Sequence, residues 1–375
     1  MLVRQETPRT SPASFCPVGS TSHSSSTELV RFGLFPLASS TRSSFLRHLS
    51  MFPSVQGGSL LLTSCCSVRL RRHSTLDIAV CGNPTIDELV HNGRVRLSPG
   101  GTALFASCAA GYLGAGVGIL GNVGEDYPPT ILRHLRTLHI DVRFLRKTAG
   151  LSTRFHITAT NGSRTLRLLE PGDKIVAPGS TGHFRAVHLG PVFNEIPSSL
   201  MTALRKKCEF LSADLQGFIR TVTANGSVQT VPRSLSRLIG QCNMVQASIE
   251  EARSQTQSRD PRVILNRFLT MQAEYAIVTM GEKGSWLGSQ SDGIYFVPPF
   301  SDRSIRDSTG AGDVFAGSWL STYLKTKDPV WASAVGSAFA SLASRKTGLA
   351  KFRISRAELF RRAVWVYNHI EASPV

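Results

Sequence analysis

Short apolar runs recur along residues 76–375 and are separated by longer stretches of helical character. An apolar run of about five residues that ends at Gly or a polar residue is typical of a strand buried on both faces. The segments with this pattern, which we expect to be strands, are 76–80, 116–120, 185–190, 209–213, 243–247 and 275–280. Helices are expected over 102–113, 128–138, 198–208 and 261–272. Strands that alternate with helices indicate an α/β fold in which a mostly parallel central sheet is flanked by helices.

Two extended segments interrupt this alternation. The residues on either side of Asn161-Gly162 are extended, and an Asn-Gly pair between extended segments predicts a β-hairpin. Asp87–Leu97 is also extended and polar. We expect these pieces, about 87–98 and 152–169, to form a small separate β-sheet that acts as a lid over the mouth of a pocket.

Residues 1–75 differ from the rest of the chain in composition. They contain eight Arg, no Lys and two acidic residues, are rich in Ser, and end in RLRRHST. Basic, Ser-rich and acid-poor N-termini are typical of organellar transit peptides. We therefore expect a disordered segment that targets a mitochondrion or plastid, followed by one folded domain at 76–375. Two alternatives stay open: a disordered tail on a cytoplasmic protein, or a start at Met51 with a shorter presequence.

The formal net charge of +17 first suggests a nucleic-acid partner. Outside 1–75, however, the basic residues are spread without long runs, and no basic motif with interleaved aromatic residues is present. A basic surface that attracts anionic nucleotides is the simpler interpretation. No apolar run is long enough for a membrane-spanning helix. The seven Cys lack CxxC spacing, which favours reduced thiols over disulfides or a zinc site.

The sequence Asp307-Ser-Thr-Gly-Ala-Gly-Asp313 precedes a helical stretch at 314–324 and carries the strongest chemical signal. A Gly-rich turn that opens a helix presents free backbone N–H groups and the positive end of the helix dipole, and both bind phosphate. Asp313 falls in the first turn of that helix, beside the expected phosphate. A carboxylate there is able to accept the proton of an attacking hydroxyl.

This heptapeptide resembles the C-terminal motif of the PfkB (ribokinase-like) carbohydrate kinases. The resemblance implies that Asp313 is the catalytic base and that the anion hole consists of Gly310, Ala311 and Gly312. It also implies that Asp307 and Thr309 help to hold a monovalent cation such as K⁺ beside the phosphate loop, with Gly348 near the same ion.

A second segment is similar to the N-terminal motif of that family. Pro99-Gly100-Gly101-Thr-Ala-Leu-Phe105 is followed by Gly114 and Gly124 at the family's spacing. The resemblance implies that Gly100 and Gly101 let the backbone approach a polyol, and that Asp87 binds its hydroxyl groups. Phe105 replaces the family's substrate-contacting Asn, and an aromatic ring cannot make two amide hydrogen bonds. Glu195 is a further candidate for contact with the substrate.

A third segment is predicted to be a strand that ends in a Gly turn, and its sequence is Val278-Thr279-Met-Gly281-Glu-Lys-Gly284. It is similar to the family's ATP-binding strand, which implies that Thr279, Gly281 and Gly284 lie near the phosphates. The family's Asn-x-x-Glu, whose Glu organises Mg²⁺ through water, reads Ser248-Ile-Glu-Glu251 here. Ser248 thus stands at a cofactor-binding position, and Glu251 keeps the expected role at Mg²⁺.

The resemblance covers about 76–375 and implies a ribokinase-like kinase that uses ATP, Mg²⁺ and, by the motif above, K⁺. Gly100-Gly-Thr-Ala103, Ser248-x-x-Glu251 and Asp214-Leu-Gln-Gly-Phe-Ile-Arg220 resemble the inositol-kinase-like branch, so myo-inositol is the expected acceptor. Two alternatives stay open: a nucleoside kinase in which Phe105 stacks on a base, and a kinase-like organellar binding protein without catalysis. If the protein is a kinase, its expected partner is a small-molecule polyol, sugar or nucleoside. The chain is expected to be a monomer or a homodimer.

Overall fold

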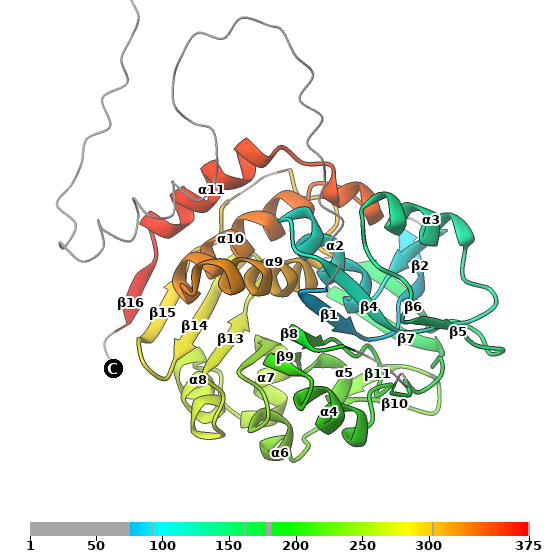
Figure 1. The fold of residues 1–375 in the computed structure, drawn as a ribbon, viewed down its shortest axis with the longest axis horizontal. Coiled ribbons are helices and arrows are strands. Elements are labelled where there is room, and N and C mark those ends of the chain that lie inside the picture. Colours follow the sequence, from blue (N-terminus) through cyan, green and yellow to red (C-terminus); the bar gives the residue numbers. More distant parts are fainter. Residues whose placement is uncertain (1–75, 92, 161–162, 178–181, 302–303, 374–375) are drawn as a thin grey trace, which may run out of the picture. The chain divides into compact units, whose positions relative to one another are not determined.

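The computed structural model describes residues 76–91, 93–160, 163–177, 182–301 and 304–373 (Figure 1). The N-terminal segment 1–75, predicted to target an organelle, and the predicted turn at Asn161-Gly162 lie outside these residues. No helix in the described ranges is both long and apolar enough to cross a membrane.

One large sheet runs through the folded part of the chain. Its order within the described residues is β16-β15-β14-β13-β12-β9-β8-β1-β4-β5. Neighbouring strands are parallel from β5 to β13 and antiparallel from β13 to β16. The bounds are β1 Ile78–Cys81, β4 Val117–Val123, β5 Leu145–Lys147, β8 Phe184–Leu189, β9 Cys208–Asp214, β12 Met244–Ser248, β13 Tyr275–Thr279, β14 Ser285–Ser289, β15 Gly293–Val297 and β16 Glu371–Ser373. The predicted, mostly parallel central sheet is confirmed.

Helices cover both faces of this sheet (Figure 1). On one face lie α2 Thr102–Tyr112, α9 Ala311–Thr326, α10 Pro329–Ala343 and α11 Arg356–Asn368, and on the other lie α4 Ser198–Arg205, α7 Ile249–Thr256 and α8 Pro261–Thr270. Shorter or peripheral elements are α3 Pro129–Thr137, α5 Gln216–Ile219, α6 Ser236–Ile239, η1 Gly281–Lys283, η2 Gly348–Phe352 and the hairpin of β10 Arg220–Val222 with β11 Val228–Thr230. The helix predicted over 198–208 ends at Arg205, because Cys208 begins β9.

Strand β1 explains why the short apolar runs fold as they do. Side chains alternate between the faces of a strand. Ile78 and Val80 join the core cluster that contains α2, α9 and α10, whereas Ala79 and Cys81 join the cluster that contains α4 and α8. All four residues are buried, so the strand needs apolar side chains at consecutive positions instead of at alternate ones.

The predicted small second sheet is also present. Its order within the described residues is β3-β2-β6-β7, with β2 Thr85–His91, β3 Arg94–Gly100, β6 Arg154–Thr160 and β7 Ser163–Glu170. The predicted β6–β7 hairpin is confirmed. The stretch predicted as one extended piece at 87–97 is in fact the β2–β3 hairpin, which turns at Gly93 with φ of 73°. Val95 and Leu97 on β3 are 58% and 60% exposed.

The described cysteines agree with the prediction of reduced thiols. Cys81, Cys108, Cys208 and Cys242 are buried and form no disulfide. Burial raises the pKa of each of these thiols.

Candidate active site

The Gly-rich turn lies at the start of α9. Gly310 precedes the helix with φ of 74°, a left-handed conformation, and Asp313 falls in the first turn. The N–H of Ala311 donates to the Ser308 carbonyl at 3.1 Å, and that of Val314 donates to the Gly310 carbonyl at 2.9 Å. The amides of Gly312 and Asp313 lie between them, in the part of a helix that has no intrahelical acceptors. The predicted anion hole and base are therefore adjacent, in a geometry suited to phosphate.

Packing explains why residue 310 is glycine. A Cβ at this position would lie 2.3 Å from Cδ2 of Phe105, well inside van der Waals contact. The Phe105 ring is 2% exposed and also lies 6.4 Å, between ring centroids, from Phe352. Phe105 thus supports the turn from the core side. The predicted contact between this ring and the acceptor stays a prediction, and the ring has little surface left for it.

A cavity of about 220 Å³ joins two of the predicted segments. Thr279, Gly281 and Gly284, predicted to bind the cofactor, line it together with Ala311 and Gly312 of the turn. The remaining wall has an apolar part, formed by Pro299, Phe300, Ile305, Phe315 and Ala340, and a polar part, formed by Glu282, Ser285, Ser308, Ser337, Ser341 and Ser344. We call this space the donor cavity. Its position at the carboxyl end of β13 is where ligands bind in sheets of this kind.

Two polar residues from neighbouring strands face the turn. Gln246 on β12 is 1% exposed, and its side-chain amide donates to the Gly312 carbonyl at 2.9 Å and to Oδ2 of Asp214 at 3.4 Å. Asp214 ends β9, and its Oδ1 accepts the Gln216 N–H at 2.9 Å. Burial raises the pKa of Asp214 well above its ordinary value, and the carboxylates of Glu251 and Asp313 raise it further. Two further acidic groups therefore act on Asp214 beside the turn.

Ser248 and Glu251 form the N-terminal cap of α7. The Glu251 N–H donates to the Ser248 hydroxyl at 3.3 Å, and the Ser248 N–H donates to Oε2 of Glu251 at 2.8 Å. This reciprocal pair is a capping box, so both residues fix the start of α7 at the end of β12. Glu251 lies close enough to Asp214 to raise the pKa of that residue, and its predicted role at Mg²⁺ stays a prediction. Ser248 does not line the donor cavity.

Asp307 and Thr309 are brought together, but the cation beside them is a lysine. Oδ1 of Asp307 accepts the Thr309 N–H at 2.9 Å. The ammonium of Lys351 lies 3.2 Å from Oδ2 of Asp307 and donates to the Asp307 carbonyl at 2.5 Å. A free monovalent ion at the same two oxygens would meet the charge of Lys351, so these residues do not fit K⁺ there.

Asp87 and the paired glycines meet at the end of the second sheet. Asp87 is 5% exposed and its Oδ1 accepts the Thr85 hydroxyl at 2.7 Å. A Cβ on Gly100 would lie 2.0 Å from Oδ2 of Asp87, and a Cβ on Gly101 would lie 2.8 Å from the Asn83 carbonyl. The predicted acceptor residues Asp87, Gly100 and Gly101 are thus in direct proximity, and only glycine allows this approach.

Glu195 lies below this group and is 1% exposed. Its Oε1 accepts the backbone N–H groups of Asn83 at 3.1 Å and Val192 at 2.8 Å, and its Oε2 accepts that of Phe193 at 2.7 Å. Burial raises its pKa, while these amide donors oppose the change. Glu195 therefore positions the loop after β1. Its contact with a substrate stays a prediction.

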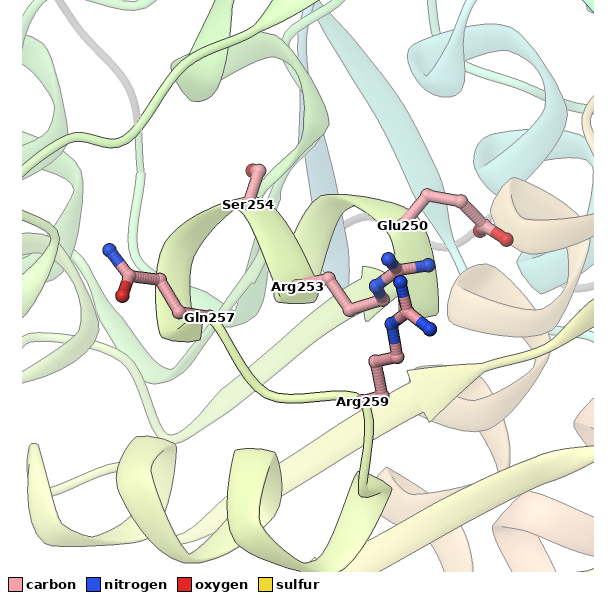
Figure 2. A pocket seen from close by; sticks show the side chains of 5 residues that line it. All are labelled: Glu250, Arg253, Ser254, Gln257 and Arg259. Carbon is pink, nitrogen blue, oxygen red and sulfur yellow. The ribbon is translucent and has the colours of Figure 1, made fainter.

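A larger cavity, of about 440 Å³, lies on the surface of α7 (Figure 2). It is lined by Glu250, Arg253, Ser254, Gln257 and Arg259, and Figure 2 shows both arginines extending toward the end of α7 that carries Glu250. Most of these side chains are exposed, and the set includes none of the predicted site residues. Its size therefore does not outweigh the chemistry gathered at the donor cavity.

Comparison with known proteins decides the family. The pfkB family of carbohydrate kinases matches residues 75–354, most of the chain. The chain belongs to the PfkB family. It is therefore a phosphotransferase with an alcohol group as acceptor, as predicted.

The similar proteins differ in their substrates. Cytidine kinase from Thermococcus kodakarensis is 25% identical over 258 residues, which cover 66% of this chain and 88% of that protein. Inositol 3-kinase from Arabidopsis thaliana is 25% identical over 303 residues, which cover 75% and 78%. The structure of a pyrophosphate-dependent kinase in the ribokinase family, complexed with a pyrophosphate analogue and myo-inositol, aligns with a TM-score of 0.64 at 22% identity and covers 72% of this chain and 96% of that one. The ribokinase-like fold class is confirmed.

The sequence analysis assigned no site role to three residues that lie beside the candidate site of this PfkB kinase: Asp214, Gln246 and Lys351. Two of them have a feature in the sequence that could have identified them. Asp214 is an acid at the carboxyl end of a parallel strand, where active-site residues gather. Gln246 is a polar residue within the apolar run Asn243–Ala247. Lys351 carried none, because its contact with Asp307 joins elements 44 residues apart.

Proposed function

We propose that this PfkB kinase transfers the γ-phosphoryl group of ATP to a hydroxyl of a sugar or polyol, with myo-inositol as the first candidate and Asp313 as the general base. The observation that carries the proposal is the donor cavity. It joins Thr279, Gly281 and Gly284 to Ala311 and Gly312 of the turn, and Asp313 follows that turn directly.

The lining of the donor cavity supports a nucleotide donor. Pyrophosphate is a small, fully charged molecule that needs cationic partners, and the described residues that line the cavity include no Lys or Arg. A purine base has apolar faces, which suit a wall that contains Phe300, Ile305 and Phe315. ATP is therefore the donor that we propose, although a similar structure holds a pyrophosphate analogue.

The proposed reaction is an in-line displacement at phosphorus. Asp313 takes the proton of the acceptor hydroxyl as the new oxygen–phosphorus bond forms, and the bond from the γ-phosphorus to the bridging oxygen of ADP breaks. The amides of the turn stabilise the charge on the moving phosphoryl group. Gln246 helps to keep the turn in place through its hydrogen bond to the Gly312 carbonyl.

The residues around the turn also fit Mg²⁺. Glu251 and Asp313 lie close enough to Asp214 to raise its pKa by repulsion between negative charges. A divalent cation relieves repulsion of this kind. In the described part of the chain, no group of three or more His, Cys, Asp or Glu side chains is arranged to enclose a metal ion. Mg²⁺ commonly keeps several waters and uses substrate phosphates as ligands, so Glu251 would hold it through water. Bound there, the ion would neutralise charge on the nucleotide phosphates.

The acceptor is proposed to bind beside Asp87, at the surface that this carboxylate forms with the glycines at 100 and 101. Asp87 is an acceptor for hydroxyl groups, and burial raises the pKa of the Tyr127 hydroxyl nearby, with smaller contributions from Cys108 and Asp87. Among the described residues, nothing hydrogen-bonds that buried hydroxyl. A ligand with several hydroxyl groups is suited to such a surface.

Two observations favour a polyol over a nucleoside. Similar proteins include inositol 3-kinase, and Phe105 is too deeply buried to offer a face for base stacking. The chain 214–220, which resembles the inositol-kinase branch, contacts the start of α2: the Gln216 amide donates to the Thr102 hydroxyl at 2.6 Å, and Arg220 donates to Oε1 of Gln216 at 2.8 Å. The similarity to cytidine kinase keeps a nucleoside acceptor as the second candidate.

The test is catalytic efficiency with ATP or pyrophosphate as donor and with myo-inositol, fructose, ribose, adenosine or cytidine as acceptor. The expected pair is ATP with myo-inositol. Preference for cytidine or adenosine would replace the polyol by a nucleoside, and preference for pyrophosphate would overturn the donor assignment.

We also propose that residues 1–75 direct the protein to a mitochondrion or plastid, on their composition alone. Fusion of 1–75 to a fluorescent reporter tests this. Organellar fluorescence is expected, and a diffuse cytosolic signal would contradict it.

A further inference from the structure

Lys351 is buried to an extent that is unusual for lysine. Its side chain is 1% exposed, and fully buried lysines are rare unless they are paired. It lies in η2, after the last helix turn of α10, and reaches back to the loop that leads into α9. Its ammonium contacts both the carbonyl and the carboxylate of Asp307.

Asp307 connects this lysine to the phosphate turn. The other carboxylate oxygen of Asp307 accepts the Thr309 N–H, and the Asp307 N–H donates to the Ser344 carbonyl at 3.0 Å. Gly310 comes next after Thr309. The position of the ammonium is thus fixed relative to the amides of the anion hole by a short chain of hydrogen bonds.

We propose that the ammonium of Lys351 is a built-in monovalent cation that orders the phosphate turn, so that the kinase does not require K⁺. This inference rests on the proposed role of Gly310–Gly312 as the anion hole. An ammonium carries one positive charge and three donors, which satisfy the two oxygens of Asp307 that a free cation would otherwise need.

Lys351 acts through Asp307 and is therefore a positioning residue. Its charge and its contacts persist at all K⁺ concentrations because the group is covalently attached. We therefore expect turnover to be independent of K⁺, in place of the K⁺ dependence that the sequence motif predicts.

The experiment compares the full-length wild type with Lys351→Met and Lys351→Gln, which remove the charge and keep most of the side-chain volume. Each protein is studied in K⁺, NH₄⁺ and tetramethylammonium at equal ionic strength. Thermal stability and ATP binding are measured as well as turnover, because neither depends on the acceptor. Lys325→Met is the control: Lys325 lies in the last turn of the same helix α9, and its ammonium contacts the Leu113 carbonyl.

For the wild type, we expect all three quantities to be the same in the three salts. For both Lys351 variants, we expect turnover in tetramethylammonium to fall by about 10- to 100-fold, which is less than the loss of about 10²- to 10³-fold when a direct oxyanion donor is removed, because Lys351 acts through Asp307. K⁺ or NH₄⁺ should restore part of the turnover and raise the melting temperature of these variants. Lys325→Met should show no such response.

Strong activation of the wild type by K⁺ would overturn the inference. So would Lys351 variants that keep full turnover, or that lose it without any response to K⁺ or NH₄⁺. If no polyol is phosphorylated but K⁺ selectively stabilises the Lys351 variants and restores their ATP binding, the proposed acceptor fails and the built-in cation stands.

Discussion

The proposed donor and acceptor sides of this site differ in the groups that form them. On the proposed donor side, the Gly-rich turn before α9 lines the cavity, and its backbone groups are the ones that we propose to bind phosphate. On the proposed acceptor side, the groups concerned are buried side chains: Asp87 accepts the Thr85 hydroxyl, and Glu195 accepts the Asn83 N–H. A site formed by backbone groups requires glycines at fixed positions, so a Gly motif in the sequence predicts it. A site formed by side chains depends on contacts between distant residues, which the sequence alone does not reveal.

The largest expected effect is on the donor side. Asp313→Asn should lower turnover by about two to four orders of magnitude, because it removes the general base. ATP affinity should change little, since the anion hole is backbone. The measurements are steady-state turnover and ATP binding by calorimetry.

Glu358→Gln is the matched control for this variant. Glu358 is also an acid in the first turn of a helix, α11, but it lies outside the site. If Asp313 merely complemented the helix dipole, both variants would affect turnover to a similar small extent.

A second change tests the contact between the two sides. Gly310→Ala places a methyl group against Phe105 and forces a non-glycine residue to φ of 74°, so turnover should fall by at least about tenfold and the melting temperature by several degrees. Gly293→Ala is the control, because φ there is 96° but nothing lies within 4 Å of the added methyl. It should lose about 1 kcal/mol of stability and keep its turnover. Equal behaviour of the two variants would show that the Phe105 contact is unimportant.

On the acceptor side, Asp87→Asn should lower kcat/KM for the acceptor by about 10- to 100-fold while KM for ATP stays constant. Thr85→Val, which removes only the hydroxyl that donates to Asp87, should have a smaller effect. Steady-state kinetics with each substrate varied in turn would reveal the split. An equal rise in both KM values would mean that Asp87 supports the fold instead of the acceptor.

The smallest effect concerns a residue outside both sides. His188 on β8 is buried, and burial lowers its pKa to about 4 from the ordinary 6.5. The unfolded chain therefore binds this proton more tightly, so His188 costs no stability above about pH 6.5 and becomes destabilising as the pH falls toward 4. Between pH 7 and pH 5 the loss should be about 2 kcal/mol.

Urea unfolding of the wild type and His188→Gln at both pH values measures this contribution. The variant should lose less stability than the wild type between pH 7 and pH 5. Equal losses would place the pKa of His188 near its ordinary value. Turnover at pH 7 should be the same for the two proteins.

Five residues that the sequence analysis assigned to the donor site line one cavity in the structure, namely Thr279, Gly281, Gly284, Ala311 and Gly312, and their pattern has a physical reason. The residues at 310–312 must be small and must open a helix, and those needs restrict the amino acids that the turn accepts. The central sheet was predictable because strands buried on both faces require consecutive apolar residues.

The acceptor side and the cation were harder to predict. Phe105 was expected at the acceptor, but the structure buries its ring beneath Gly310, a contact between residues 205 positions apart. Lys351 likewise meets Asp307 only after folding. The β2–β3 hairpin was missed because polar, exposed strands carry no strong hydrophobic pattern.

Direct observation of the product tests the central claim. The full-length protein is mixed with ATP, Mg²⁺ and myo-inositol, and ³¹P NMR follows the phosphorus resonances; Asp313→Asn is run beside it. We expect ADP and one new phosphomonoester in equal amounts with the wild type, and almost none with the variant in the same time. Absence of a phosphomonoester with myo-inositol, or its formation at the same rate by Asp313→Asn, would contradict the account.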